Sequence, residues 1–317
     1  LLSSRFASLP RVTGDAVGVG RGLVKTDTNN WSPRLGFAYR LGSANQTVIR
    51  GGVGRFFPAE AAQGVRDALS RGPFNYERTR LRPPLAAPLS PTPQPESVVY
   101  PAVGAVDLGL QTPEVMQYNL TVERELPAGF GVRVSYTGAR LRKLITYRLF
   151  NTLPASTVPF DPNRAADRQR LPHPNLSTDS FIIENGARGH YDALQLEARR
   201  RYRNGLAFNL AYTLAYTRSQ APDVGNSTTG VIQYDPYDID RNEGPDPFIT
   251  RHRFLAYGSW DVPVGRRRRH LAGASRGVDT LLGGWTVTTI LLARSGYYLT
   301  PYYSAVDQNG VNPANTR

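Results

Sequence analysis

Alternation of apolar and polar residues is the feature that most constrains how this chain can fold. In the first alternating stretch, Leu35, Phe37, Tyr39 and Leu41 occupy every second position, which is the side-chain period of a β-strand. A short polar stretch, 42–46, separates them from a second apolar run. The pattern predicts a β-hairpin with one apolar face.

Similar stretches recur along the chain, and two of them contain clear turn signals. They are 115–140, 191–219, 251–264 and 285–296. A turn is predicted at 127–130, and Asn204-Gly205 is a dipeptide typical of two-residue hairpin turns. The sequence therefore predicts about eight or nine antiparallel strands.

The connections between these strands differ in length in a regular way. The connections within hairpins are short: 42–46, 127–130 and 203–205. Those between hairpins are long: about 58–112, 144–188 and 218–250. In an up-and-down sheet every second connection lies at the same end, so one end has tight turns and the other has large loops. That asymmetry is typical of outer-membrane barrels, which have short periplasmic turns and long extracellular loops.

We therefore predict an all-β fold, an antiparallel up-and-down transmembrane β-barrel segment, with residues 1–317 forming part of one incomplete barrel domain. A soluble β-sandwich or propeller would also explain the alternation, but not the enlargement of loops at one end only. The link 265–284 departs from the pattern, because it is long and falls at the short-turn end. We interpret it as a long periplasmic turn.

The charge of the chain calls for an anionic partner. The net charge is +13 and the sequence pI is near 10.2, and the basic run Arg266–Arg269 lies in the predicted periplasmic turn. Anionic lipid headgroups or nucleic acid could contact this run. Nucleic-acid binding favours aromatic residues interleaved with basic ones, whereas here the aromatic residues alternate with small polar ones. We therefore expect no nucleic-acid partner.

Enzyme and cofactor signatures are missing from the sequence. The chain has no cysteine, which excludes disulfides, thiol catalysis and cysteine-bound metals. It contains no G-x-S-x-G, H-E-x-x-H or P-loop motif, and its four histidines have no metal-ligand spacing. We expect no catalytic residues, no cofactor and no enzymatic activity.

One acidic loop offers candidate calcium ligands. Its carboxylates are hard oxygen donors of the kind that Ca²⁺ prefers, although their spacing is not that of an EF-hand. The candidates are Asp235, Asp238, Asp240 and Glu243. A solvated polar loop is the alternative interpretation of the same residues.

A second candidate set follows from the alternation within the predicted strands. Polar residues at every second position would line the lumen of a barrel, where they could contact a plug or a solute. They are Arg34, Arg40, Gln117, Asn119, Glu123, Arg133, Gln195, Glu197, Arg199 and Arg201. Gly51, Gly52 and Gly54 predict a bend, a bulge or the close approach of another segment.

Five stretches, in this order, carry a family resemblance. They are 29–57 (NNWSPRLGFAYRLGSANQTVIRGGVGRFF), 112–140 (TPEVMQYNLTVERELPAGFGVRVSYTGAR), 190–219 (HYDALQLEARRRYRNGLAFNLAYTLAYTRS), 251–265 (RHRFLAYGSWDVPVG) and 281–296 (LLGGWTVTTILLARSG). Together they resemble the barrels of TonB-dependent outer-membrane receptors, of the Oar-like type that carries a carboxypeptidase-regulatory-like domain.

The resemblance implies part of a barrel of about 22 strands in the outer membrane of a Gram-negative bacterium. It implies outer-membrane lipid, a plug domain of the same full-length chain, the TonB complex and a bulky nutrient ligand as partners. The plug, the N-terminal domains and the TonB-contacting segment would lie upstream, so we expect this chain to be an internal piece. A passive or adhesive barrel, or a soluble basic β protein that binds polyanions, remains as an alternative.

Overall fold

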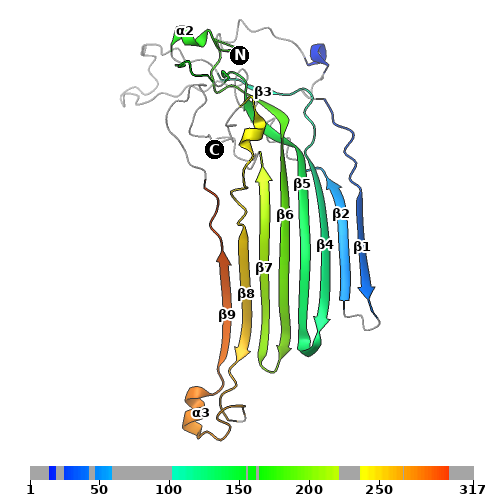
Figure 1. Ribbon diagram of the computed structural model, residues 1–317, viewed down its shortest axis with the longest axis vertical. Coiled ribbons are helices and arrows are strands. Elements are labelled where there is room, and N and C mark those ends of the chain that lie inside the picture. The colour runs from blue at the N-terminus through cyan, green and yellow to red at the C-terminus, as the bar shows by residue number, and fades with distance from the viewer. Residues whose placement is uncertain are drawn as a thin grey trace, which may run out of the picture.

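A single nine-stranded sheet makes up most of the protein. The structure is a computed structural model that describes residues 14–18, 25–42, 47–58, 102–154, 156–161, 164–220, 236–266 and 268–299. The strands lie side by side in the order β1-β2-β4-β5-β6-β7-β8-β9, each antiparallel to its neighbours, and β3 pairs in parallel with β6 (Figure 1). Within the described residues the sheet is open, with β1 and β9 at its edges. The predicted all-β, up-and-down architecture is confirmed.

The element bounds are as follows. The strands are β1 (Arg34–Leu41), β2 (Thr47–Phe56), β3 (Gly104–Val106), β4 (Glu114–Leu126), β5 (Phe130–Leu149), β6 (Phe181–Arg203), β7 (Leu206–Ser219), β8 (His252–Asp261) and β9 (Thr286–Arg294). The helices are η2 (Asp15–Val17), η4 (Pro127–Gly129), α2 (Ala165–Arg168), η5 (Ile239–Asn242) and α3 (Arg276–Leu282). No helix in the described ranges is long and apolar enough to cross a membrane.

Two of the three predicted tight turns lie at one end of the sheet, and the third, 42–46, lies mostly outside the described residues. Arg203 pairs with Leu206, and the two residues between them, Asn204 and Gly205, have φ angles of 52° and 76°. Two successive positive φ angles define the turn type that matches the twist of a hairpin, and an Asn-Gly pair tolerates them best. The turn between β4 and β5 is formed by η4 at the same end (Figure 1).

The longer link between β8 and β9 also lies at the short-turn end and contains α3 (Figure 1). The side chain of Ser275 caps this helix by accepting a hydrogen bond from the backbone N–H of Val278. Asp279 Oδ1 accepts a hydrogen bond from the backbone N–H of Arg266 at 2.6 Å, which ties the start of the link to the helix. The sequence predicted the place of this link but not its helix.

The predicted loop 144–188 is too long, because the strands on either side extend into it. β5 continues to Leu149, and β6 begins at Phe181. The pairing of these two strands shifts register around Leu144, next to Lys143 with a φ of 55°. Such a bulge interrupts the alternation of side chains. The sequence pattern therefore breaks where the strand itself continues.

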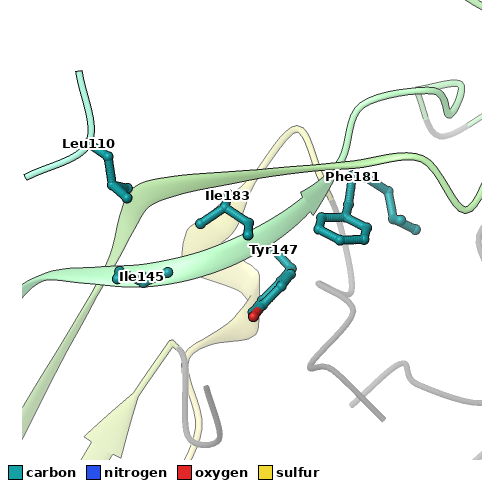
Figure 2. Packing of buried hydrophobic residues seen from close by; sticks show 6 residues of the cluster. Leu110, Ile145, Tyr147, Phe181 and Ile183 are labelled. Atoms are coloured by element: carbon teal, nitrogen blue, oxygen red, sulfur yellow. The ribbon is translucent and has the colours of Figure 1, made fainter. Parts of the chain in front are cut away.

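Beyond the bulge, β5 and β6 carry a small hydrophobic core (Figure 2). Ile145 and Ile183 are 2% and 0% exposed, and the rings of Tyr147 and Phe181 meet edge to face with centroids 5.2 Å apart. Leu110 covers this core from the preceding connection. The predicted loop 58–112 contains β3 and Leu110, and its residues 59–101 lie outside the described part of the chain.

Two buried polar side chains organise the chain between β5 and β6. Asn151 is fully buried and donates to the carbonyl oxygens of His173 and Leu176, at 3.0 and 2.9 Å. Arg168 is 3% exposed, and its guanidinium donates to the carbonyls of Pro174 and Leu176. These bonds replace the regular pairing that this connection lacks, and so give it a defined conformation.

Candidate functional site

The strand pairing brings the predicted lumen-facing residues to one face of the sheet. Glu123 of β4 pairs with Arg133 of β5, which pairs with Glu197 of β6. The same register places the other predicted positions in line with these three, on the face that we call the polar face. They are Arg34, Arg40, Gln117, Asn119, Gln195 and Arg199.

A ladder of ion pairs crosses the polar face. The carboxylate of Glu123 lies 3.7 Å from the guanidinium of Arg50 and 4.0 Å from that of Arg133. Arg133 also pairs with Glu197, and Glu197 accepts a hydrogen bond from Asn209 at 2.8 Å. Alternating charges on neighbouring strands stabilise their register, although each exposed pair contributes only about 0–1 kcal/mol. Arg50 and Asn209 were not among the predicted residues, although the alternation would have identified both.

The ladder borders a cleft of about 500 Å³ near the tight turns. Its polar lining combines arginines and carboxylates from five strands: Arg40, Arg50, Glu123, Arg124, Glu125, Arg133, Glu197 and Arg199. Arg201, the last of the predicted residues, forms an ion pair with Glu125 at 2.8 Å and so joins the same group. The structure therefore brings most of the predicted charged residues together at one end of the wall.

The polar character of this face does not extend over the whole sheet. In β8 and β9 the positions in register with the ladder are occupied by Leu255, Tyr257, Ile290 and Leu292. Ile290 is 78% exposed. The polar face thus grades into apolar surface toward β9, which accounts for the irregular alternation of these two strands in the sequence.

The opposite face, which we call the apolar face, carries exposed aliphatic and aromatic side chains over its central part. On β1 it presents Leu35, Phe37 and Tyr39, and the whole of this strand is exposed. Other members are Leu120, Val122, Val132, Val134, Leu194, Leu196, Leu210, Tyr216 and Trp260. No protein core covers these side chains in the part of the chain that the structure describes.

The glycines of β2 do not form a bulge, which was one of the three predicted roles. β2 pairs with both neighbours without a register shift, so no bulge is present. A Cβ on Gly51 would lie 2.5 Å from the ring of Phe37, and one on Gly54 would lie 2.9 Å from the ring of Phe56. The space that these glycines leave is filled by aromatic rings of the sheet itself.

A polar cluster interrupts the apolar face toward the loop end. Asp192 accepts hydrogen bonds from the hydroxyls of Tyr136 and Tyr118, at 2.6 and 3.2 Å, and from the guanidinium of Arg140 at 3.0 Å. Gly138 makes room for this arrangement, because a Cβ there would lie 2.3 Å from the ring of Tyr118. The sequence pattern did not predict this cluster. The only signal was an acidic residue at an otherwise apolar alternating position.

The candidate calcium ligands make other contacts. The side chain of Asp238 accepts a hydrogen bond from the backbone N–H of Asp240. Asp240 pairs with Arg188 at 3.0 Å, and Glu243 lies 3.6 Å from Arg218. Asp235 lies outside the described residues. Among the residues that are described, no group of three or more histidine or acidic side chains could hold a metal ion. The calcium site stays a prediction from the sequence.

The comparison with protein families decides the identity of this sheet. A family profile described as "Outer membrane beta barrel domain" matches residues 6–317. The chain belongs to the outer membrane beta barrel domain family. Its location is accordingly the outer membrane of a Gram-negative bacterium. This membership excludes the alternative of a soluble basic β protein. No curated protein matches the chain.

Solved structures of outer-membrane proteins resemble the fold. They include the outer membrane transporter YddB from Escherichia coli (11% identity, TM-score 0.43, covering 72% of this chain and 26% of that one). The siderophore receptor PirA from Acinetobacter baumannii gives 11% identity and a TM-score of 0.41, with 74% and 27% covered. The ferric enterobactin receptor PfeA from Pseudomonas aeruginosa gives 15% and 0.38, with 74% and 26% covered. The chain spans about a quarter of the length of each.

Proposed function

We propose that this chain is part of the barrel of a TonB-dependent outer-membrane receptor of the Oar-like type, which takes up a bulky ligand with energy from the TonB complex. The five stretches of family resemblance support this, because they include all or part of every strand of the sheet except β3. On this proposal the plug, the TonB-contacting segment and the remaining strands belong to the rest of the full-length protein.

The observation that carries the proposal is the two-faced sheet. In an outer-membrane barrel one face of each strand meets lipid and the other meets a polar lumen. The apolar face, with exposed residues such as Leu120 and Val134, suits the lipid. The polar face, with the ladder of Glu123, Arg133 and Glu197, suits a hydrated lumen or the polar surface of a plug. We assign the ten predicted residues to the lumen on this basis.

The orientation of the wall follows from its two ends. The tight turns, among them 203–205, would face the periplasm, as would the link with α3. The connections 150–180 and 220–251, together with 58–112, would form the extracellular loops. The hydrogen bonds of Asn151 and Arg168 give the connection 150–180 a defined conformation, which suits contact with an external ligand.

A passive or adhesive barrel is the alternative, since its wall would have the same two faces and its long loops would lie at the same end. The two functions differ in what fills the lumen and in whether TonB is engaged. A plugged receptor is closed at rest, whereas a passive barrel conducts ions. The ligand itself is not specified by these strands.

The test uses the full-length protein in its native cells. Protease added to intact cells should cut within 58–112 or 218–250 and leave 42–46 and 203–205 intact. Photo-crosslinkers placed along the segment upstream of residue 1 should capture TonB, and the purified protein should show no steady conductance in a planar bilayer. Cuts confined to the tight turns would reverse the orientation. An open conductance without a TonB cross-link would establish the passive barrel instead.

A further inference from the structure

A row of basic side chains lies on the apolar face where the wall meets the loops. Arg140 of β5 pairs with His190 of β6, which pairs with Arg218 of β7, so the three lie side by side across the sheet. Arg142 and Arg188, at the loop end of the same strands, line a cleft of about 160 Å³ together with the three residues of the row. These strands lie in the middle of the sheet, so neighbouring strands flank the row on both sides.

The charge of this cleft is mainly positive. Four arginines and a histidine line it together with Glu243, and two further carboxylates, those of Asp192 and Asp240, lie beside it. Carboxylates pair with three of the arginines: Asp192 with Arg140 and Asp240 with Arg188, each at 3.0 Å, and Glu243 with Arg218 at 3.6 Å. Each guanidinium has five N–H donors, so a single carboxylate contact leaves donors for another anion. Planar guanidinium groups are well suited to phosphate oxygens.

The position of the row relative to a membrane can be derived from the strands. Arg200 and His190 are both on the apolar face of β6, and the wall between them carries apolar residues such as Leu194 and Leu196. Ten residues at ~3.3 Å each, tilted by about 40°, span roughly 25 Å along the membrane normal. That is about the height of the apolar band of an outer-membrane barrel. With Arg200 at the periplasmic boundary of this band, the row lies at the level of the outer-leaflet headgroups.

We propose that the cleft formed by Arg140, Arg142, Arg188, His190 and Arg218 binds a phosphate group of a lipid headgroup in the outer leaflet. In a Gram-negative outer membrane that lipid is a phosphorylated glycolipid. Its acyl chains would cover the apolar face below the row, and its phosphate would contact the arginines. The proposal rests on the orientation given under the proposed function, but not on transport or on TonB.

The test measures lipid binding to the full-length protein purified from outer membranes in mild detergent. The variant Arg140→Gln/Arg218→Gln should bind added lipid A at least about tenfold more weakly in native mass spectrometry, as expected for lost charge-assisted hydrogen bonds. The matched control Arg50→Gln/Arg133→Gln removes the same charge from the polar face and should bind like the wild type. A second variant, His190→Gln/Arg218→Gln, leaves the bond between Arg140 and Asp192 intact. Heat-modifiable mobility on gels checks that each variant is folded.

Three further probes identify the source of the phosphate. Lipid A without its phosphates should lose binding as the arginine variant does, and inorganic phosphate at millimolar concentration should not displace the lipid. The proposal would be overturned if Arg140→Gln/Arg218→Gln and His190→Gln/Arg218→Gln both bound lipid A as tightly as the wild type. It would also be overturned if the wild type bound dephosphorylated lipid A as tightly as lipid A. A preference for cardiolipin over lipid A would overturn the assignment to the outer leaflet. TonB cross-linking in the same variants should be unchanged, so failure of the transport proposal is detected separately.

Discussion

The two ends of the wall keep their apolar side chains out of water in different ways. At the loop end, Ile145 and Ile183 are buried in a protein core. Farther down the sheet, Leu120 is 49% exposed and Phe37 is 56% exposed, although both lie in regular strands. The loop end therefore contains a core of the kind found in water-soluble domains. The wall depends on lipid to cover the surface that its own fold leaves open.

This comparison predicts that mutations in the two regions fail in different ways. A cavity in the loop-end core should loosen that end in water and leave insertion of the wall intact. A charge on the apolar face should weaken the wall in the membrane. Each of the following variants is made in the full-length protein.

Ile183→Ala should destabilise the loop-end core by about 2–5 kcal/mol, because it removes a fully buried side chain and leaves a cavity. Protease added to whole cells should then cut the connection 150–180 faster, while heat-modifiable mobility of the barrel is unchanged. The control Ile182→Ala alters the neighbouring, half-buried residue and should have a smaller effect. If the barrel failed to insert instead, the two regions would not be independent.

Leu120→Arg should destabilise the wall by roughly 2–4 kcal/mol, the cost of an arginine on the lipid face near the midplane. Urea unfolding of the protein in lipid vesicles measures this loss. The control Asn119→Arg places the same side chain on the polar face, one residue away, and should be tolerated. A reversed result would mean that the polar face meets the lipid.

Gly138→Ala should cost about 1–3 kcal/mol, because the new Cβ would lie 2.3 Å from the Tyr118 ring and would force that ring away. The displaced Tyr118 would lose its hydrogen bond to Asp192. Gly36→Ala is the matched control, since the nearest atom to its Cβ would be 3.6 Å away. Unfolding in vesicles compares the two, and equal losses would show that Tyr118 has room to move at little cost.

Arg133→Gln should have the smallest effect, about 0–1 kcal/mol, because its side chain is 44% exposed and such pairs are screened by water and salt. Raising the salt concentration should reduce the difference from the wild type further. A loss of several kcal/mol that persists in high salt would mean that a plug buries the ladder in the intact receptor.

Much of the wall could be predicted from the sequence. The alternation of Leu35, Phe37 and Tyr39 identified a strand and its apolar face, and Asn204-Gly205 identified a turn to the residue. The predicted lumen set shares one face of the sheet. Every second residue of a strand lies on the same face, and the register between strands joins matching faces. The alternation was less informative in β8 and β9, where residues such as Leu255 and Ile290 make the second face apolar as well.

Other features required the pairing of distant residues to be known. The extension of β5 to Leu149 was missed because the bulge near Leu144 shifts the alternation. The cluster around Asp192 was missed because its partners lie on two other strands. The residues of the basic row Arg140, His190 and Arg218 likewise come from three strands. Local sequence patterns do not indicate which residues far apart in the chain will come into contact.

The sequence by itself determined the strands, their two faces and the ends at which they turn, because these depend on neighbouring residues and on a period of two. The tertiary structure alone decided which charges meet across the sheet, what fills the space beside each glycine and where the loop-end core forms. Each of these depends on the register between strands, and register is set by many weak contacts acting together.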